Sequence, residues 1–113
     1  PKVFDKLHYD CAADRRIASH TDKLKKTGRN QLVICGIESH VCVLQSALGF
    51  RARGYDVAAV VDAMASRKAF SKETAIARMA MAGISIVTME MVVFEWLEKA
   101  GTGVFRDGLK LIK

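Results

Sequence analysis

The sequence is poor in proline and cysteine and has no long apolar run. One proline and three cysteines occur in 113 residues. No stretch approaches the roughly 18 apolar residues of a spanning helix, and no charged-then-apolar leader precedes a cleavage site, so we expect no membrane partner. Cys11, Cys35 and Cys42 are odd in number and lack metal-type spacing. They predict no disulfide framework and favour a reducing cytoplasm.

Acidic residues are the minority among the charged ones. The chain has 12 acidic and 18 basic residues and a formal net charge of +6. The basic residues concentrate in residues 15–29, RRIASHTDKLKKTGR, where Asp22 interrupts them and no Phe, Trp or Tyr occurs. Surfaces that bind single-stranded nucleic acid interleave basic and aromatic side chains. The segment therefore favours a solvated helix face, and we expect no nucleic-acid partner.

Short apolar runs alternate with helix-like segments along the chain. Strands are predicted at residues 31–37, 55–61 and 84–88, and helices at residues 14–27, 39–53, 71–83 and 88–99, with further helical turns in 104–113. The expected N-caps are Asp14, Ser39, Ser71 and Thr88. This order, with short connections, predicts one α/β domain over residues 1–113, with parallel strands and helices on both sheet faces.

The predicted sheet is small for a doubly covered one. Residues 31–37, QLVICGI, form a continuous apolar run that is typical of a strand buried on both faces, with Cys35 in the core. Three parallel strands nevertheless leave one edge strand exposed, which natural sheets avoid. This open edge indicates that further strands belong to the complete sheet.

The strand ends bring chemistry to one rim of the sheet. Ligands of open parallel sheets bind outside the carboxyl ends of the strands, and Cys42 follows the first strand near the start of a predicted helix. Free amides and the helix dipole favour a thiolate there and can hold an oxyanion. Free cysteine is also among the most buried residue types. Spacing alone leaves nucleophile and packing open.

Three stretches of the sequence resemble a known family. They are VFDKLHYD (3–10), VICGIESHVCVLQSAL (33–48) and VVDAMASR (60–67), with TMEMVVFEWL (88–97) downstream. From Val3 to Leu97 the chain resembles the C-terminal half of the isochorismatase-like cysteine hydrolases. The resemblance implies a Rossmann-like three-layer αβα sandwich with strand order 3-2-1-4-5-6, of which this chain carries strands 4, 5 and 6 and lacks the N-terminal strands.

The resemblance also implies roles for residues near the first strand's end. It makes Cys42 the nucleophile, which forms a thioester with a small amide-type or related substrate, and Lys6 the lysine beside the thiol. It makes the backbone amides of Glu38 and Cys42 the oxyanion hole, and it implies a cis peptide bond between Ile37 and Glu38. We expect a lysine ammonium to lower the pKa of a neighbouring thiol.

Other polar residues at the rim are expected to support the site. Ser39 and His40 border the cysteine, and Asp62 ends the second strand. The three histidines lack the spacing of metal ligands, and we expect no metal and no other cofactor within this chain. Family members commonly form dimers or larger assemblies, so the resemblance implies a homo-oligomer that binds a small-molecule substrate.

One part of the family's catalytic set has no counterpart in this sequence. The family's aspartate, which accepts the thiol proton, ends a strand that would precede Val3. We therefore expect negligible hydrolase activity from these 113 residues alone. Two explanations stay open: a fragment of a longer protein, or a short paralogue completed by a partner chain. The competing functional class is a non-catalytic protein that keeps the fold for oligomerisation or partner binding.

Overall fold

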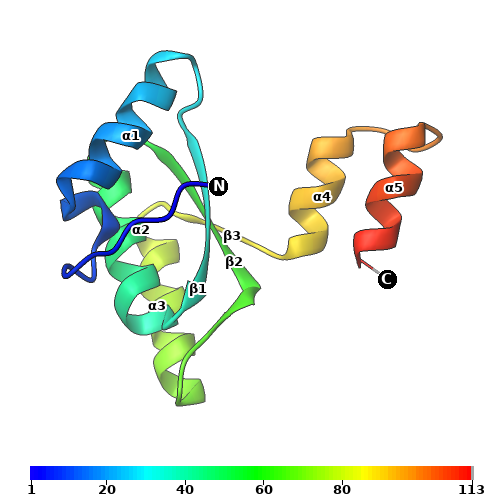
Figure 1. Cartoon of the computed structure of the whole chain (residues 1–113). Helices are drawn as coiled ribbons and strands as arrows, with labels where there is room; N and C mark the ends of the chain where they lie inside the picture. The colour runs from blue at the N-terminus through cyan, green and yellow to red at the C-terminus, as the bar shows by residue number, and fades with distance from the viewer. Residues whose placement is uncertain (113) are drawn as a thin grey trace.

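The chain folds around three parallel strands in the order β1-β2-β3, as Figure 1 shows. A computed structural model describes residues 1–112. The strands are β1 (Gln31–Ile37), β2 (Asp56–Ala65) and β3 (Ser85–Val87). The helices are α1 (Arg15–Lys26), α2 (Leu44–Ala52), α3 (Ala69–Met81), α4 (Met89–Leu97) and α5 (Gly103–Ile112), with a 3-10 turn η1 (Cys11–Ala13) and a π-helical turn η2 (Ser39–Val43). The α/β class and the parallel sheet are confirmed.

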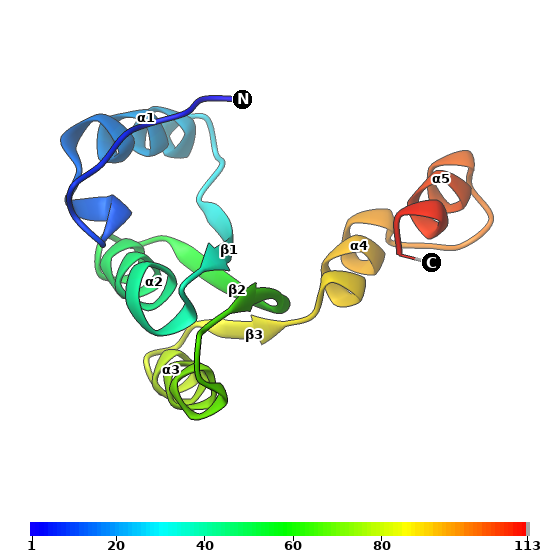
Figure 2. The same cartoon turned by 60° about the horizontal axis from the view of Figure 1, so that its bottom comes forward.

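The helices are divided unequally between the two faces of the sheet. Helices α2 and α3 pack on one face, while α4 stands on the other side and contacts β2 and α5 (Figure 2). The pair α4–α5 extends away from the sheet. No helix within residues 1–112 is long and apolar enough to cross a membrane.

The hydrophobic core lies between β2 and the helices α2 and α3. Ala47 of α2, Ala59 of β2 and Met79 of α3 are fully shielded from solvent and belong to one buried cluster. Small side chains at positions 47 and 59 let the helices approach the sheet closely, and Met79 fills the remaining space. This core fixes α2, and with it the turn that precedes α2, against the central strand.

The first strand is exposed on one face, contrary to the prediction that it is buried on both. Leu32 and Ile34 pack against the core, whereas Val33 is 45% exposed and Ile37 is 72% exposed. Cys35 shares their orientation and is exposed as well, so its placement in the core was wrong. Successive strand residues point to opposite faces, and in the described part of the chain no helix covers this face of β1.

Two of the four predicted helix caps are confirmed. The carboxylate of Asp14 accepts hydrogen bonds from the amides of Arg16 and Ile17 at the start of α1. The hydroxyl of Thr88 accepts from the amide of Met91 in the first turn of α4. Both side chains satisfy amides that have no partner within the helix.

The other two caps were wrong. Glu38, not Ser39, occupies the N-cap of η2, because the wider π turn takes in Ser39 as its first residue. Helix α3 begins two residues before Ser71, after Lys68, so Ser71 lies inside it. Sequence cannot separate a serine at a cap from one in the first turn.

Strand β2 is longer than predicted, and this extension builds one wall of the rim. The prediction ended it at residue 61, whereas it runs to Ala65 and pairs Ala65 with Ile37 beyond a bulge in β2. Gly36 is the first residue of β1 that pairs beyond this bulge, and its φ is 121°, a conformation that side chains disfavour. The extension carries Ser66 to the level of the turn that follows β1.

Candidate functional site

Cys42 lies in the π-helical turn η2, directly after β1 and before α2. Its thiol is free and half-buried. The peptide bond between Ile37 and Glu38, where the strand enters the turn, is cis. The cysteine therefore sits at the carboxyl end of a parallel strand, in the position where such sheets bind ligands.

The backbone of this turn is held by hydrogen bonds to one carbonyl group. The carbonyl oxygen of Glu38 accepts hydrogen bonds from the amides of Val41, at 3.1 Å, and Val43, at 3.2 Å. π-helical turns of this kind occur frequently at functional sites.

Lys6 does not bond the cysteine directly. Its Nζ donates to the carbonyl oxygens of His8, at 2.9 Å, and Tyr9, at 3.3 Å. No hydrogen bond joins Lys6 and Cys42 within residues 1–112. The Tyr9 carbonyl also accepts a hydrogen bond from Ser46 Oγ. Ser46 follows Cys42 by four residues on a continuous helical segment, so the two lie on nearly the same face.

The side chains on the other side of the turn are tied to the end of β2. Glu38 Oε2 accepts from the backbone amide of Arg67 at 3.0 Å and from its Nε at 3.2 Å. The backbone hydrogen bond and then the guanidinium hold the pKa of the Glu38 carboxyl below its ordinary value of 4.5. The stabilisation from the bonds between Arg67 and the Glu38 carboxylate is therefore fully present above pH 4.5 and is lost as the pH falls through the lowered pKa. His40 Nδ1 lies 2.8 Å from Ser66 Oγ.

Asp62 supports the neighbouring loop. It lies near the end of β2, and its Oδ1 accepts from the amide of Met89, at 2.8 Å, at the start of α4. Within residues 1–112, no group of three His, Cys, Asp or Glu side chains is arranged to hold a metal ion.

Known proteins resemble this chain in sequence and in fold. The model of the isochorismatase domain matches residues 2–91. The chain belongs to the isochorismatase family. It is 35% identical over 112 residues to the secreted isochorismatase effector Isc1 of Phytophthora sojae. The matched region covers 99% of this chain and 52% of that protein.

Two solved structures of this family share the fold. The MAR1 ribonuclease of Caenorhabditis elegans superposes with a TM-score of 0.84 and 32% identity, over 96% of this chain and 54% of that one. The YcaC gene product of Escherichia coli, an octameric hydrolase of unknown specificity, superposes with a TM-score of 0.65 and 28% identity, over 74% of this chain and 40% of that one. The chain thus spans about half the length of the relatives that it matches.

The contacts of three residues near the turn that carries Cys42 were not predicted from the sequence. Ser46 links the segment that carries Lys6 to α2, and Ser66 and Arg67 contact the turn that carries Cys42. The signal for Ser46 was available, because it lies four positions after the cysteine on one helix. Ser66 and Arg67 end the family-like stretch 60–67, but their contacts to the turn were not predicted, since these depend on the unforeseen length of β2.

Two buried serines near the site differ in their hydrogen bonding, and their alanine variants should differ accordingly. Ser46 Oγ accepts from the amide of Cys11 at 2.9 Å and bonds Tyr9, whereas the fully buried Ser39 Oγ has no partner within residues 1–112. We expect S46A to lower the free energy of unfolding by about 1–3 kcal/mol, because it strands a buried amide. S39A should leave it unchanged or raise it. Urea unfolding followed by circular dichroism measures both, and equal losses would contradict the hydrogen-bond assignment.

A hollow of about 320 Å³ adjoins the turn. His40, Arg67, Lys68, Phe70 and Ser71 line it, and Cys42 does not.

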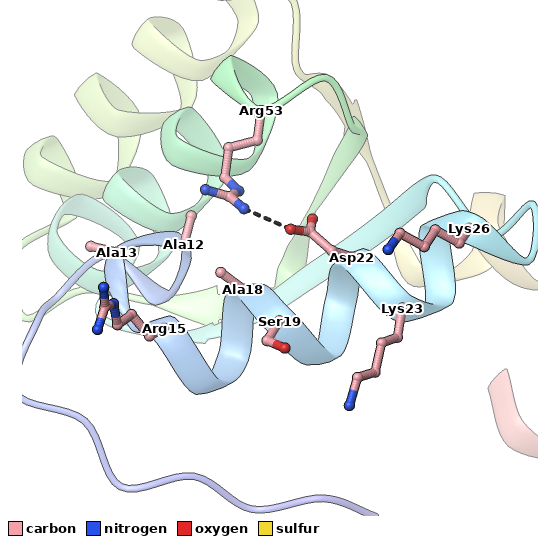
Figure 3. Close-up of a pocket in the computed structure, with 9 residues that line it drawn as sticks. All are labelled: Ala12, Ala13, Arg15, Ala18, Ser19, Asp22, Lys23, Lys26 and Arg53. Atoms are coloured by element: carbon pink, nitrogen blue, oxygen red, sulfur yellow. Dashed lines mark hydrogen bonds and ion pairs between the residues drawn. The ribbon is translucent and has the colours of Figure 1, made fainter.

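A second hollow, of about 600 Å³, lies along α1 (Figure 3). Four basic side chains line it, and Arg53 reaches across to Asp22 at 2.8 Å. A hydrogen bond from the hydroxyl of Tyr55, at 2.6 Å, is the main cause that lowers the pKa of Asp22. Burial, followed by this same bond, raises the pKa of Tyr55. The pair joins α1 to the start of β2 and takes no part in the cysteine turn.

Proposed function

We propose that this chain carries the nucleophile of a cysteine hydrolase that acts on small amide-type or related substrates. The observation that supports this most is the place of Cys42, in a π-helical turn that directly follows β1 at the carboxyl end of a parallel strand. The backbone amides of Glu38 and Cys42 are proposed to stand beside its thiol. Acyl transfer needs such an arrangement of a nucleophile and amide donors.

In this mechanism the Cys42 thiolate attacks the carbonyl carbon of the substrate. A C–S bond forms, and the carbonyl π electrons move to oxygen, where the amides of Glu38 and Cys42 stabilise the negative charge. The oxyanion then collapses, the C–N bond breaks, and the amine leaves with a proton from a general acid. Water cleaves the resulting thioester and releases the acid product and the thiolate.

Lys6 is proposed to keep the thiol ionised. Its ammonium is connected to the face of Cys42 through the carbonyl of Tyr9 and the hydroxyl of Ser46. An ammonium close to a thiol stabilises its charged form. Since Lys6 now donates to two backbone carbonyls, the catalytic form requires its side chain to rotate toward the sulfur.

The general acid and base is proposed to come from outside this chain. The family's aspartate precedes the matched region, and the chain covers 52% of its relative from Phytophthora sojae. The remaining strands are proposed to pair with the open edge of β1, and their connecting helices to cover its exposed face, which carries Val33 and Ile37. The YcaC gene product is octameric, and we propose that the complete protein also self-associates.

A second candidate function rests on the same exposed face. Val33 and Ile37 of β1 and Trp96 of α4 are exposed apolar side chains, which favour a protein that keeps the fold for association. This candidate predicts an ordinary Cys42 thiol, whereas the hydrolase predicts an activated one.

The experiment that tests the hydrolase proposal is an assay of ammonia release from small primary amides, including nicotinamide. The isolated chain should release no more ammonia than its C42S variant, because the thiol lacks its proton acceptor. Release by the isolated chain that C42S abolishes would contradict the external general base. The same assay with the complementary half present separates the two candidate functions.

A further inference from the structure

The loop after β2 touches the nucleophile turn at two points. Arg67 donates to the Glu38 carboxylate from its backbone amide and from its side chain, and Ser66 lies within hydrogen-bonding distance of His40. The contacts join residues 26 and 29 positions apart in the sequence. Glu38 and His40 flank Ser39, and both precede Cys42 on the turn.

We propose that Ser66 and Arg67 are positioning residues for the oxyanion turn. Arg67 bonds the carboxylate of Glu38, and Ser66 bonds the ring of His40. These contacts keep the amides of Glu38 and Cys42 directed at the thiol. This inference rests on the proposed role of Cys42 as nucleophile. Neither residue needs to touch the substrate in this role, and Cys42 does not line the hollow that His40 and Arg67 share.

The two donors to the Glu38 carboxylate differ in distance and in exposure. This difference determines which variants are informative. The backbone amide of Arg67 is the shorter donor, at 3.0 Å, and the guanidinium is exposed to solvent. Truncating Arg67 would leave the backbone donor in place, so the informative changes are at the acceptor. Glu38→Ala removes both bonds and Glu38→Gln keeps an oxygen that accepts from the backbone amide, while either variant keeps the amide of residue 38.

Electrostatics and positioning predict effects of opposite sign. A carboxylate near a thiol disfavours the thiolate, so if Glu38 acted only through its charge, its removal would make Cys42 more reactive. If Glu38 holds the turn in place, its removal lets the amides move away from the sulfur and makes Cys42 less reactive. The direction of the change therefore decides between the two roles.

The experiment measures the rate at which iodoacetamide alkylates Cys42 across pH, with peptide mass mapping to separate it from Cys11 and Cys35. We expect E38A to slow the reaction at pH 7 by about three- to tenfold and to move its midpoint to higher pH. E38Q should restore most of the rate. D107A, which breaks an exposed ion pair with Lys110 on α5, should match the wild type.

Each result has a defined meaning. A rate for E38A equal to or above that of the wild type would overturn the positioning role while leaving the nucleophile intact. A wild-type Cys42 that reacts no faster than Cys35 would refute the proposed function itself, and the inference with it. Should E38A fail to fold by circular dichroism, S66A carries the test, with a slower Cys42 expected and an unchanged rate overturning the proposal.

Discussion

Supplying the complementary half of the domain is expected to give this chain measurable amidase activity, and Cys42→Ser is expected to remove it. The half in question is the part of a relative, such as the MAR1 ribonuclease, that this chain does not match. We propose that co-expression supplies strands that pair with the open edge of β1 and the general base that the proposed mechanism requires. Loss of the nucleophile in such enzymes lowers kcat by on the order of a thousandfold or more.

The controls for this experiment lie within the chain. Cys35→Ser changes an exposed cysteine of β1 seven residues from the nucleophile and should leave ammonia release within about twofold of the wild type, because this residue has no part in the chemistry. Lys6→Met should reduce release and shift its pH profile toward the alkaline side. Activity that survives C42S, or no activity in a complex shown to form by gel filtration, would contradict the hydrolase proposal.

Met79→Ala is expected to cause a large loss of stability. Met79 is fully buried between α3 and the sheet. Truncation removes apolar contacts and leaves a cavity, which together cost about 2–5 kcal/mol. A half-length domain has little stability in reserve, so the variant should unfold at much lower urea concentration and release α2 and the Cys42 turn.

The matched control for Met79 is another methionine on the same helix. Met81 is 89% exposed, and M81A should change the free energy of unfolding by no more than about 0.5 kcal/mol. Met79→Leu conserves volume and should cost less than about 1.5 kcal/mol, which keeps the test meaningful if M79A does not fold. Similar losses in the free energy of unfolding for M79A and M81A would show that the packing of Met79 does not stabilise the core.

The elements of this fold were predictable because their signals are local. Apolar runs bounded by turn residues marked β1 and β3, and Asp14 and Thr88 are caps that bond their own helix. The position at which β2 ends could not be predicted from nearby residues. It depends on the pairing of Met64 and Ala65 with β1 beyond the bulge in β2, and pairing partners far apart in sequence leave no trace in a short window.

Burial was less predictable than secondary structure. The apolar run of β1 indicated a strand covered on both faces, and such runs are typical of complete parallel sheets. Cys35 is nevertheless exposed, because the described chain supplies cover for only one face. The sequence of β1 thus suits a larger sheet than these residues form. The same limit applies to Lys6, whose motif was recognisable while its contacts to His8 and Tyr9 were not.

The state of the Cys42 thiol can be measured directly in the isolated chain. Alkylation by iodoacetamide, followed across pH for each of the three cysteines, compares Cys42 with the more exposed Cys35 under identical conditions. We predict that Cys42 reacts faster than Cys35 at pH 7. A Cys42 that reacts no faster than Cys35 would contradict an activated nucleophile at this turn.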